Sequence, residues 1–268
     1  MTIRRWGAIT AIALLTAACS GASLAGGSPS ANHASLTIYA AASLNVALAS
    51  VKTAYETAVP GTTLTISTDS SSALEAKIEQ AAPADVFLSA DTTNPQKLLD
   101  KGLASGAVVT FAGNRLAVIV PRANPAGLRN PVDLANPGVK VIAAGESVPI
   151  TKYATRLIAN LAAQAGYPAD FAAKYAANIA SREDSVAGVV SKVGLGEGDV
   201  GIVYVTDARA SSDVTMISVP DAANVPAAYA GVVVRASQNQ AAARAFLAWL
   251  AGADGKSILA SFGFLPPS

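Results

Sequence analysis

From Leu36 onward, short apolar segments alternate with amphipathic segments along the whole chain. The apolar segments are rich in Val, Ile and Thr, which favours strands, and the amphipathic segments space apolar residues for one helical face. Buried strands separated by such helices are typical of α/β folds whose mostly parallel sheets are covered by helices on both faces. We therefore predict an α/β fold, and we find no internal sequence repeat in it.

The boundaries of these elements follow from periodicity and from Gly and Pro positions. Strands are predicted at residues 36–40, 62–67, 85–90, 115–120, 139–144, 177–181, 200–205, 214–219 and 228–235. Helices are predicted at residues 43–58, 72–81, 95–101, 149–165, 185–194, 239–251 and 254–261.

The N-terminus is typical of a bacterial export signal. Residues 1–18 contain two arginines, Arg4 and Arg5, followed by an uncharged apolar run that is shorter than the ~20 residues of a membrane-spanning helix. The sequence LTAAC ending at Cys19 resembles a lipobox, so we expect cleavage before Cys19 and its lipidation, which would hold the protein at the cell membrane. The alternative is an ordinary secretory peptide with a chance cysteine. Residues 19–35 are small and polar and predict a flexible tether.

Composition excludes several functional classes. The single His, His33, lies in the predicted tether, which leaves little room for a Ser-His-Asp triad or a histidine metal site. A single Cys excludes an internal disulfide, a four-cysteine zinc site and an iron–sulfur cluster. A net charge of +1 without a run of Lys or Arg gives no nucleic-acid footprint. The nucleotide-binding motif GxxxxGK[ST] does not occur. We expect no cofactor and no enzymatic activity.

Two strand-to-helix junctions are candidate anion sites. Ser43 follows three alanines, and Ser70 to Ser72 follow the strand at 62–67. Ligands of α/β sheets bind where strands end and helices begin, and free N–H groups at a helix start attract anions. Capping is the alternative, because serine is a preferred N-cap and Ser72 with Glu75 has capping-box spacing. Three small residues before Ser43 also allow close approach of a ligand, which capping does not require.

Three later junctions have similar character. Residues 145–153 enter a helix through Pro149, and residues 182–185 enter the next one at Ser185. The apolar strand at 200–205 ends near Tyr204. Tyr204 is either a core residue or a hydroxyl that points into a cleft.

Several motifs carry a family resemblance. They are YAAASL (39–44), SSSAL (70–74), QAAPADVFLSAD (80–91), VP (148–149), YA (153–154), ED (183–184), GIVY (201–204), DA (207–208) and FGF (262–264). In order and spacing, residues 36–264 resemble the molybdate-binding proteins of bacterial molybdate ABC transporters. The resemblance implies a periplasmic-binding-protein fold of two lobes, residues 36–115 plus 226–268 and residues 116–225, with a ligand cleft at the hinge. It also implies an extracytoplasmic monomer that binds molybdate or tungstate and delivers it to a membrane permease.

The resemblance also implies a ligand set, carried over position by position. The hydroxyls and N–H groups of Ser43 and Ser71, the N–H groups of Ile150 and Ser185, and the Tyr204 hydroxyl would hold the oxyanion, so molybdenum would be bound only as its oxyanion. Ser185 stands where an apolar residue is common, so its hydroxyl would add a contact. Asp69 stands where the family is usually uncharged, and we expect its carboxylate to point outward.

Other functions remain open at this stage. The same architecture would accept another tetrahedral oxyanion, such as sulfate or thiosulfate. A deaminase with a thioether cofactor would need a Cys after Cys19, and a hydrolase would need a His beside Ser43 or Ser71; neither residue is present. A purely structural lipoprotein is the third alternative.

Overall fold

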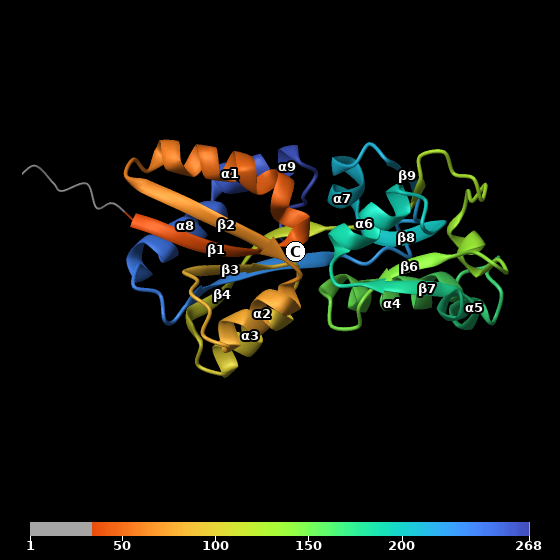
Figure 1. The fold of residues 1–268 in the computed structure, drawn as a ribbon, viewed down its shortest axis with the longest axis horizontal. Coiled ribbons are helices and arrows are strands. Elements are labelled where there is room, and N and C mark those ends of the chain that lie inside the picture. Colours follow the sequence, from red (N-terminus) through yellow and green to blue (C-terminus); the bar gives the residue numbers. More distant parts are fainter. Residues whose placement is uncertain (1–33, 268) are drawn as a thin grey trace, which may run out of the picture. The chain divides into compact units, whose positions relative to one another are not determined.

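The computed structural model describes residues 34–267, which form two five-stranded sheets flanked by helices (Figure 1). The predicted α/β class is confirmed. The first sheet contains, in spatial order, β2 (Thr62–Asp69), β1 (Ala34–Ala41), β3 (Val86–Ser89), β10 (Ala227–Val234) and β4 (Ala104–Asn114). The second contains β7 (Ile179–Glu183), β6 (Val141–Ala144), β8 (Val200–Tyr204), β5 (Leu116–Pro121) and β9 (Val214–Ile217).

Both sheets are mixed, which corrects the expectation of mostly parallel sheets. In the first sheet β1 pairs in parallel with β2 and β3, whereas β10 pairs antiparallel with β3 and β4. In the second sheet β6 pairs in parallel with β7 and β8, whereas β5 pairs antiparallel with β8 and β9. Four of the five strands of each sheet run in one direction, as expected. Two of the four strand pairs in each sheet are nevertheless antiparallel, because β10 and β5 run against their neighbours.

The reversed strands are those by which the chain enters a sheet from the other one. β4 ends at Asn114 and β5 begins at Leu116, which pairs with Tyr204 at the end of β8. β10 begins at Ala227, which pairs with Asn114. A strand that begins beside the C-terminal ends of its neighbours must run antiparallel to them. The ends of the parallel strands of both sheets therefore face the crossing segments.

Helices cover both faces of each sheet (Figure 1). Around the first sheet α1, α8 and α9 contact one another on one side, and α2 and α3 contact one another on the other. Around the second sheet α6 contacts α7, and α4 contacts α5. The bounds are η1 (Ala42–Leu44), α1 (Asn45–Ala58), α2 (Ser71–Glu79), α3 (Thr93–Asp100), η2 (Pro131–Ala135), α4 (Pro149–Ala162), α5 (Phe171–Ala177), α6 (Val186–Gly194), α7 (Val205–Ala210), α8 (Gln240–Leu250) and α9 (Ala253–Ser261).

The core extends through both sheets. One buried hydrophobic cluster includes Leu36 and Ile38 of β1 together with Val118 and Ile119 of β5, all fully buried. A smaller cluster lies beneath α2 and α3 and includes Phe87 and Leu98. Because burial of apolar surface is the main stabilising contribution, the crossing region is held by the same core as the sheets.

Four elements were missed by the sequence patterns, namely the short helix η2, β4, α5 and α7. β4 is an edge strand whose apolar residues are interrupted by Gly106 and by exposed positions. α5 spans seven residues, and α7 continues an apolar strand without a break in hydropathy, so its start is not visible in the sequence. β1 begins at Ala34, inside the predicted tether, because the Ala34 N–H donates to the Gly61 carbonyl and extends the pairing with β2.

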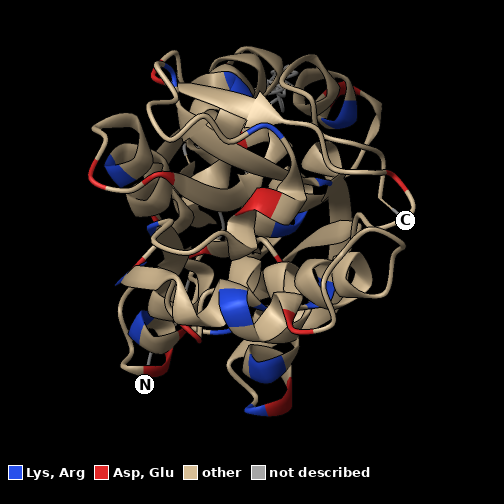
Figure 2. Cartoon of the chain, turned by 90° about the vertical axis from the view of Figure 1, so that its right-hand side faces the viewer, with Lys and Arg blue, Asp and Glu red and all other residues tan. Residues whose placement is uncertain are grey.

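The predicted export signal (1–18), the proposed lipidation at Cys19 and the tether up to His33 lie outside the described residues. Within residues 34–267, no helix has the length and hydropathy needed to cross a bilayer. Lys and Arg are interspersed with Asp and Glu on the face shown in Figure 2.

Candidate functional site

A small cavity lies between the two sheets, where four helical segments begin. Its volume is about 10 Å³, room for roughly one water molecule. It is lined by Ala41, Ala42, Ser43, Ser70, Ser71, Ala90, Val148, Pro149, Ile150, Val186 and Tyr204. Four of the five predicted ligand residues, namely Ser43, Ser71, Ile150 and Tyr204, are thus brought together.

On the first-sheet side, α2 presents Ser71. The N-cap of this helix is Ser70, whose hydroxyl accepts the Ala73 N–H at 3.3 Å, rather than Ser72 as the capping-box spacing had indicated. The Ser71 hydroxyl accepts the Ala90 N–H at 3.0 Å. Because the Ser71 oxygen is the acceptor in that bond, its proton is free to be donated elsewhere. The Ser71 N–H lies in the first turn, where helical N–H groups have no partner within the helix.

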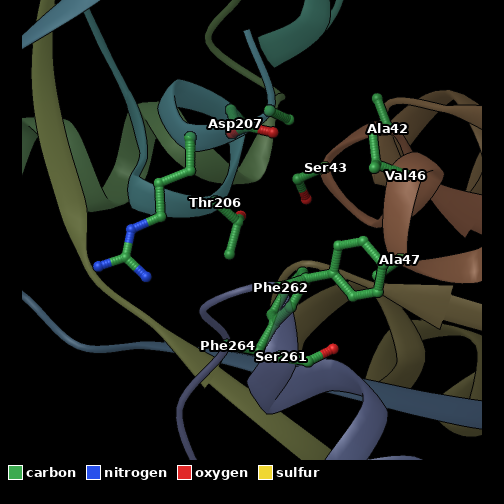
Figure 3. A pocket seen from close by; sticks show the side chains of 11 residues that line it. Ala42, Ser43, Val46, Ala47, Thr206, Asp207, Ser261, Phe262 and Phe264 are labelled. Atoms are coloured by element: carbon green, nitrogen blue, oxygen red, sulfur yellow. The ribbon is translucent and has the colours of Figure 1, made fainter.

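Ser43 lies in η1, directly after β1. Its side chain is largely buried, and its Oγ is 2.8 Å from the Tyr229 hydroxyl of β10. The alanines before it keep this end of β1 narrow, so a ligand can approach the backbone. Ser43 also borders a second cavity of about 330 Å³, in which Thr206 and Asp207 of α7 lie opposite η1 (Figure 3).

On the second-sheet side, backbone groups of apolar residues face the cavity. Pro149 is the first residue of α4, and the Ile150 N–H follows in the first turn without a helical partner. At α6 the Ser185 hydroxyl accepts the Gly188 N–H at 3.3 Å and so caps the helix. Ser185 itself is outside the lining, and its neighbour Val186, the first residue of α6, takes that place. No side-chain pattern could have revealed Val186, because only its backbone is polar.

Tyr204 is both a core residue and a lining residue, so the two interpretations of the sequence are not exclusive. Its side chain is 1% exposed, and its ring packs edge-on against Tyr153 and Tyr229. Its hydroxyl is 3.5 Å from the Ala90 carbonyl oxygen, which is at the long limit of a hydrogen bond. Burial raises the pKa of Tyr204 well above its ordinary value, so the hydroxyl remains a proton donor at neutral pH.

None of the eleven lining residues carries a charged side chain. The nearby Asp69 carboxylate accepts the Ser70 N–H at 2.7 Å and pairs with Lys77 at 2.9 Å, which directs it towards the exposed face of α2. Among residues 34–267 there is no cluster of acidic, His and Cys side chains that would hold a metal ion. Neutral donors at several helix starts, with the positive ends of the helix dipoles behind them, form a site for a small anion.

The fold and the site are those of a solute-binding protein, and comparison with known proteins agrees. The family model for bacterial extracellular solute-binding proteins matches residues 36–265, so the chain belongs to this family. It is a family of binding proteins, which agrees with the expectation of a function without catalysis.

The chain is 34% identical to the molybdate-binding protein ModA of Mycobacterium tuberculosis, over 89% of this chain and 87% of that one. It is 31% identical to the Escherichia coli ModA, over 97% and 98% of the two chains. Among solved structures, the periplasmic molybdate-binding protein of Azotobacter vinelandii matches with a TM-score of 0.73 and 25% identity, over 87% of this chain and all of that one.

Proposed function

We propose that this protein binds molybdate, and also tungstate, outside the cytoplasm and delivers it to an ABC permease for import. The observation that carries the proposal is the convergence of uncharged donors from four helix starts on one cavity. Two curated relatives with this ligand, at 34% and 31% identity, support it. The ligand is held as an intact oxyanion, and no cofactor is needed.

The proposed ligand set has a hydroxyl part and a backbone part. Ser43 and Ser71 contribute hydroxyl and N–H donors, and Tyr204 contributes its hydroxyl. Ile150 and Ser185 contribute backbone N–H groups, with Val186 as a further donor at the start of α6. Since the Ser185 oxygen already accepts the Gly188 N–H, its proton is also available.

Neutral donors suit a dianion for a physical reason. Each hydrogen bond to a charged acceptor is stronger than a neutral one and offsets part of the lost hydration. A site of donors only disfavours monohydrogen phosphate, because the proton of that ion needs an acceptor. Sulfate has no such proton, so it must be discriminated by size.

We propose that residues 36–115 plus 226–268 and residues 116–225 move as two lobes about the crossing segments. In the structure the lobes are close together, since Ser72 Oγ is 3.5 Å from Ser147 Oγ across the cavity. A cavity of about 10 Å³ is too small to admit a tetrahedral oxyanion directly, so the lobes must separate for entry. Closure on the larger oxyanion would then present a single surface to the permease.

We further propose that the protein acts as a monomer held at the membrane by a lipid on Cys19. The LTAAC motif supports the lipid anchor, as does 30% identity over 96% of the chain to a Bacillus subtilis protein described as a putative substrate-binding lipoprotein. Mass spectrometry of the mature N-terminus tests it: a diacylglycerol-modified Cys19 is expected. An unmodified terminus at any residue would overturn the anchor.

The ligand is tested by calorimetric titration of the purified protein with molybdate, tungstate, sulfate and phosphate. We expect saturable heat with molybdate and tungstate. Heat only with sulfate or phosphate would instead support a receptor for another oxyanion. Absence of binding to every oxyanion would overturn the proposal.

A further inference from the structure

A chain of buried hydrogen bonds runs behind Ser43 and away from the cavity. The Ser43 hydroxyl meets the Tyr229 hydroxyl at 2.8 Å, and the Tyr229 hydroxyl meets Asn114 Nδ2 at 3.4 Å. Asn114 Nδ2 also donates to Thr206 Oγ1 at 2.8 Å. These four residues come from η1, β10, the end of β4 and α7, and each is at most 9% exposed.

The donor and acceptor roles in this series of hydrogen bonds are fixed at Asn114. The Arg115 N–H donates to Asn114 Oδ1 at 2.9 Å, so the oxygen of this amide is assigned by a group that can only donate. The other side of the amide is therefore Nδ2, which has no acceptor capacity. The Tyr229 oxygen must accept from Nδ2, and its single proton is left for Ser43.

The same reasoning continues to the cavity. Within residues 34–267 the Tyr229 hydroxyl has Ser43 Oγ and Asn114 Nδ2 as its hydrogen-bond neighbours. Because Tyr229 donates to Ser43 Oγ, the Ser43 proton has to point elsewhere, and an oxyanion in the cavity that Ser43 lines would accept it. Burial raises the pKa of Tyr229 well above its ordinary value, so this donor is not lost at neutral pH.

We propose that Asn114 and Tyr229 are positioning residues that orient the Ser43 hydroxyl as a donor into the cavity. The inference rests on the proposed function and goes beyond it, because it assigns a specificity role to two residues outside the lining. An oriented donor favours oxyanions without a proton. If the Ser43 hydroxyl were free to turn, it would also accept a hydrogen bond from a protonated oxyanion such as monohydrogen phosphate.

The test is a double-mutant cycle with Tyr229→Phe and Ser43→Ala, with affinity for molybdate measured by calorimetry. Ser43→Ala is expected to weaken binding about 10- to 100-fold, and Tyr229→Phe alone by about 3- to 10-fold. In the Ser43→Ala background, Tyr229→Phe should change the affinity by less than about twofold, because its effect passes through Ser43. Tyr55→Phe, which removes a buried tyrosine hydroxyl from α1, is the matched control and should bind like the wild type.

A selectivity measurement separates orientation from general damage to the fold. In Tyr229→Phe, affinities for molybdate and sulfate should fall together, whereas affinity for monohydrogen phosphate, measured by competition, should stay constant or rise. Equal weakening of all three oxyanions, or additive effects in the cycle, would overturn the positioning role. If Tyr229→Phe does not fold, as judged by thermal unfolding, Asn114→Ala takes its place in the same cycle under the same criterion. A wild type that binds no oxyanion overturns the proposed function and the positioning role together, whereas additivity in a wild type that binds overturns the positioning role alone.

Discussion

The two sheets have one strand order but contribute different chemistry to the cavity between them. When the strands are numbered along the chain without the reversed one, each sheet has its second strand at one edge, then its first and third, then the reversed strand, then its fourth: β2-β1-β3-β10-β4 and β7-β6-β8-β5-β9. The first sheet contributes serine hydroxyls at Ser43 and Ser71. The second contributes backbone N–H groups of apolar residues, together with one phenol, Tyr204. The shared topology places helix starts at the cavity, and it leaves the side chains at those starts free to differ.

This difference decides how each side is altered by mutation. A hydroxyl donor is removed by a single side-chain substitution, whereas a backbone donor at a helix start is removed only by proline. The comparison therefore yields one test for each side of the cavity. A third test concerns two carboxyl groups near the cavity, those of Asp69 and Asp207.

The largest effect is expected on the first side. Ser43→Ala combined with Ser71→Ala should weaken molybdate binding by about 3–6 kcal/mol, since each bond to a charged ligand contributes about 1.5–3 kcal/mol. This corresponds to a loss of about 10²- to 10⁴-fold in affinity, measured by calorimetry. Ser50→Ala is the matched control, because Ser50 is an exposed serine of α1 that does not line the cavity. An unchanged affinity in the double variant would mean that the site lies elsewhere.

On the second side, Val186→Pro should remove one donor with little damage to the fold. Proline is favoured at the first position of a helix, and the preceding Ser185 has the extended backbone (φ −150°, ψ 162°) that proline requires. We expect molybdate binding, again measured by calorimetry, to weaken by about 1.5–3 kcal/mol, because proline has no N–H to donate to the oxyanion.

The control for this substitution is Ala253→Pro at the first position of α9. Its preceding residue, Gly252, is also extended (φ −83°, ψ −170°), and Ala253 is exposed and outside the cavity. It should bind like the wild type. Equal affinities of Val186→Pro and Ala253→Pro would show that the second side does not use the α6 backbone, and the contrast between the two sides would then reduce to Ile150 and Tyr204.

The same contrast explains what the sequence could and could not predict. Ser43 and Ser71 are polar residues directly after apolar strands, so the pattern itself indicated a site on the first side. The role of Tyr204 was open, because a tyrosine at a strand end serves the core or a cleft. The pattern also indicated the junctions at residues 145–153 and 182–185, but the N–H groups of Ile150 and Ser185 were named as donors only through the family resemblance, since a backbone donor leaves no signature in the side chains.

Other features depend on tertiary contacts that no local pattern contains. Val186 borders the cavity only because α6 begins one residue after its cap, Ser185. The Tyr229–Asn114 contact joins residues 115 positions apart. The reversal of β5 and β10 follows from the chain crossing twice between the sheets, whereas hydrophobic alternation reports strands and helices but not strand direction. Most elements were therefore predictable, and their pairing was not.

A carboxyl group also lies behind each side, in contrasting surroundings. On the first side Asp69 pairs with Lys77 and is partly exposed. On the second side Asp207 accepts the Tyr204 N–H at 3.1 Å, and burial raises its pKa from 3.8 to about 7. An acidic group whose pKa is raised in the folded state stabilises the fold while it is protonated. This stabilisation is fully present below about pH 4 and is lost as the pH rises to about 7.

Asp207→Asn should therefore stabilise the protein most above pH 7 and clearly less at pH 5, since the amide still accepts the Tyr204 N–H but never ionises. The pKa alone converts to about 4 kcal/mol. Asp207 borders the cavity of about 330 Å³ next to Ser43 (Figure 3), where water can hydrate the carboxylate, so we expect about 1–2 kcal/mol, or roughly 2–8 °C in the thermal midpoint at pH 8. Asp69→Asn, which breaks a surface ion pair, should change stability by less than about 1 kcal/mol. A stabilisation by Asp207→Asn that is the same at pH 5 and pH 8 would show that it does not arise from ionisation, and the two carboxyl groups would then not differ in the way the structure indicates.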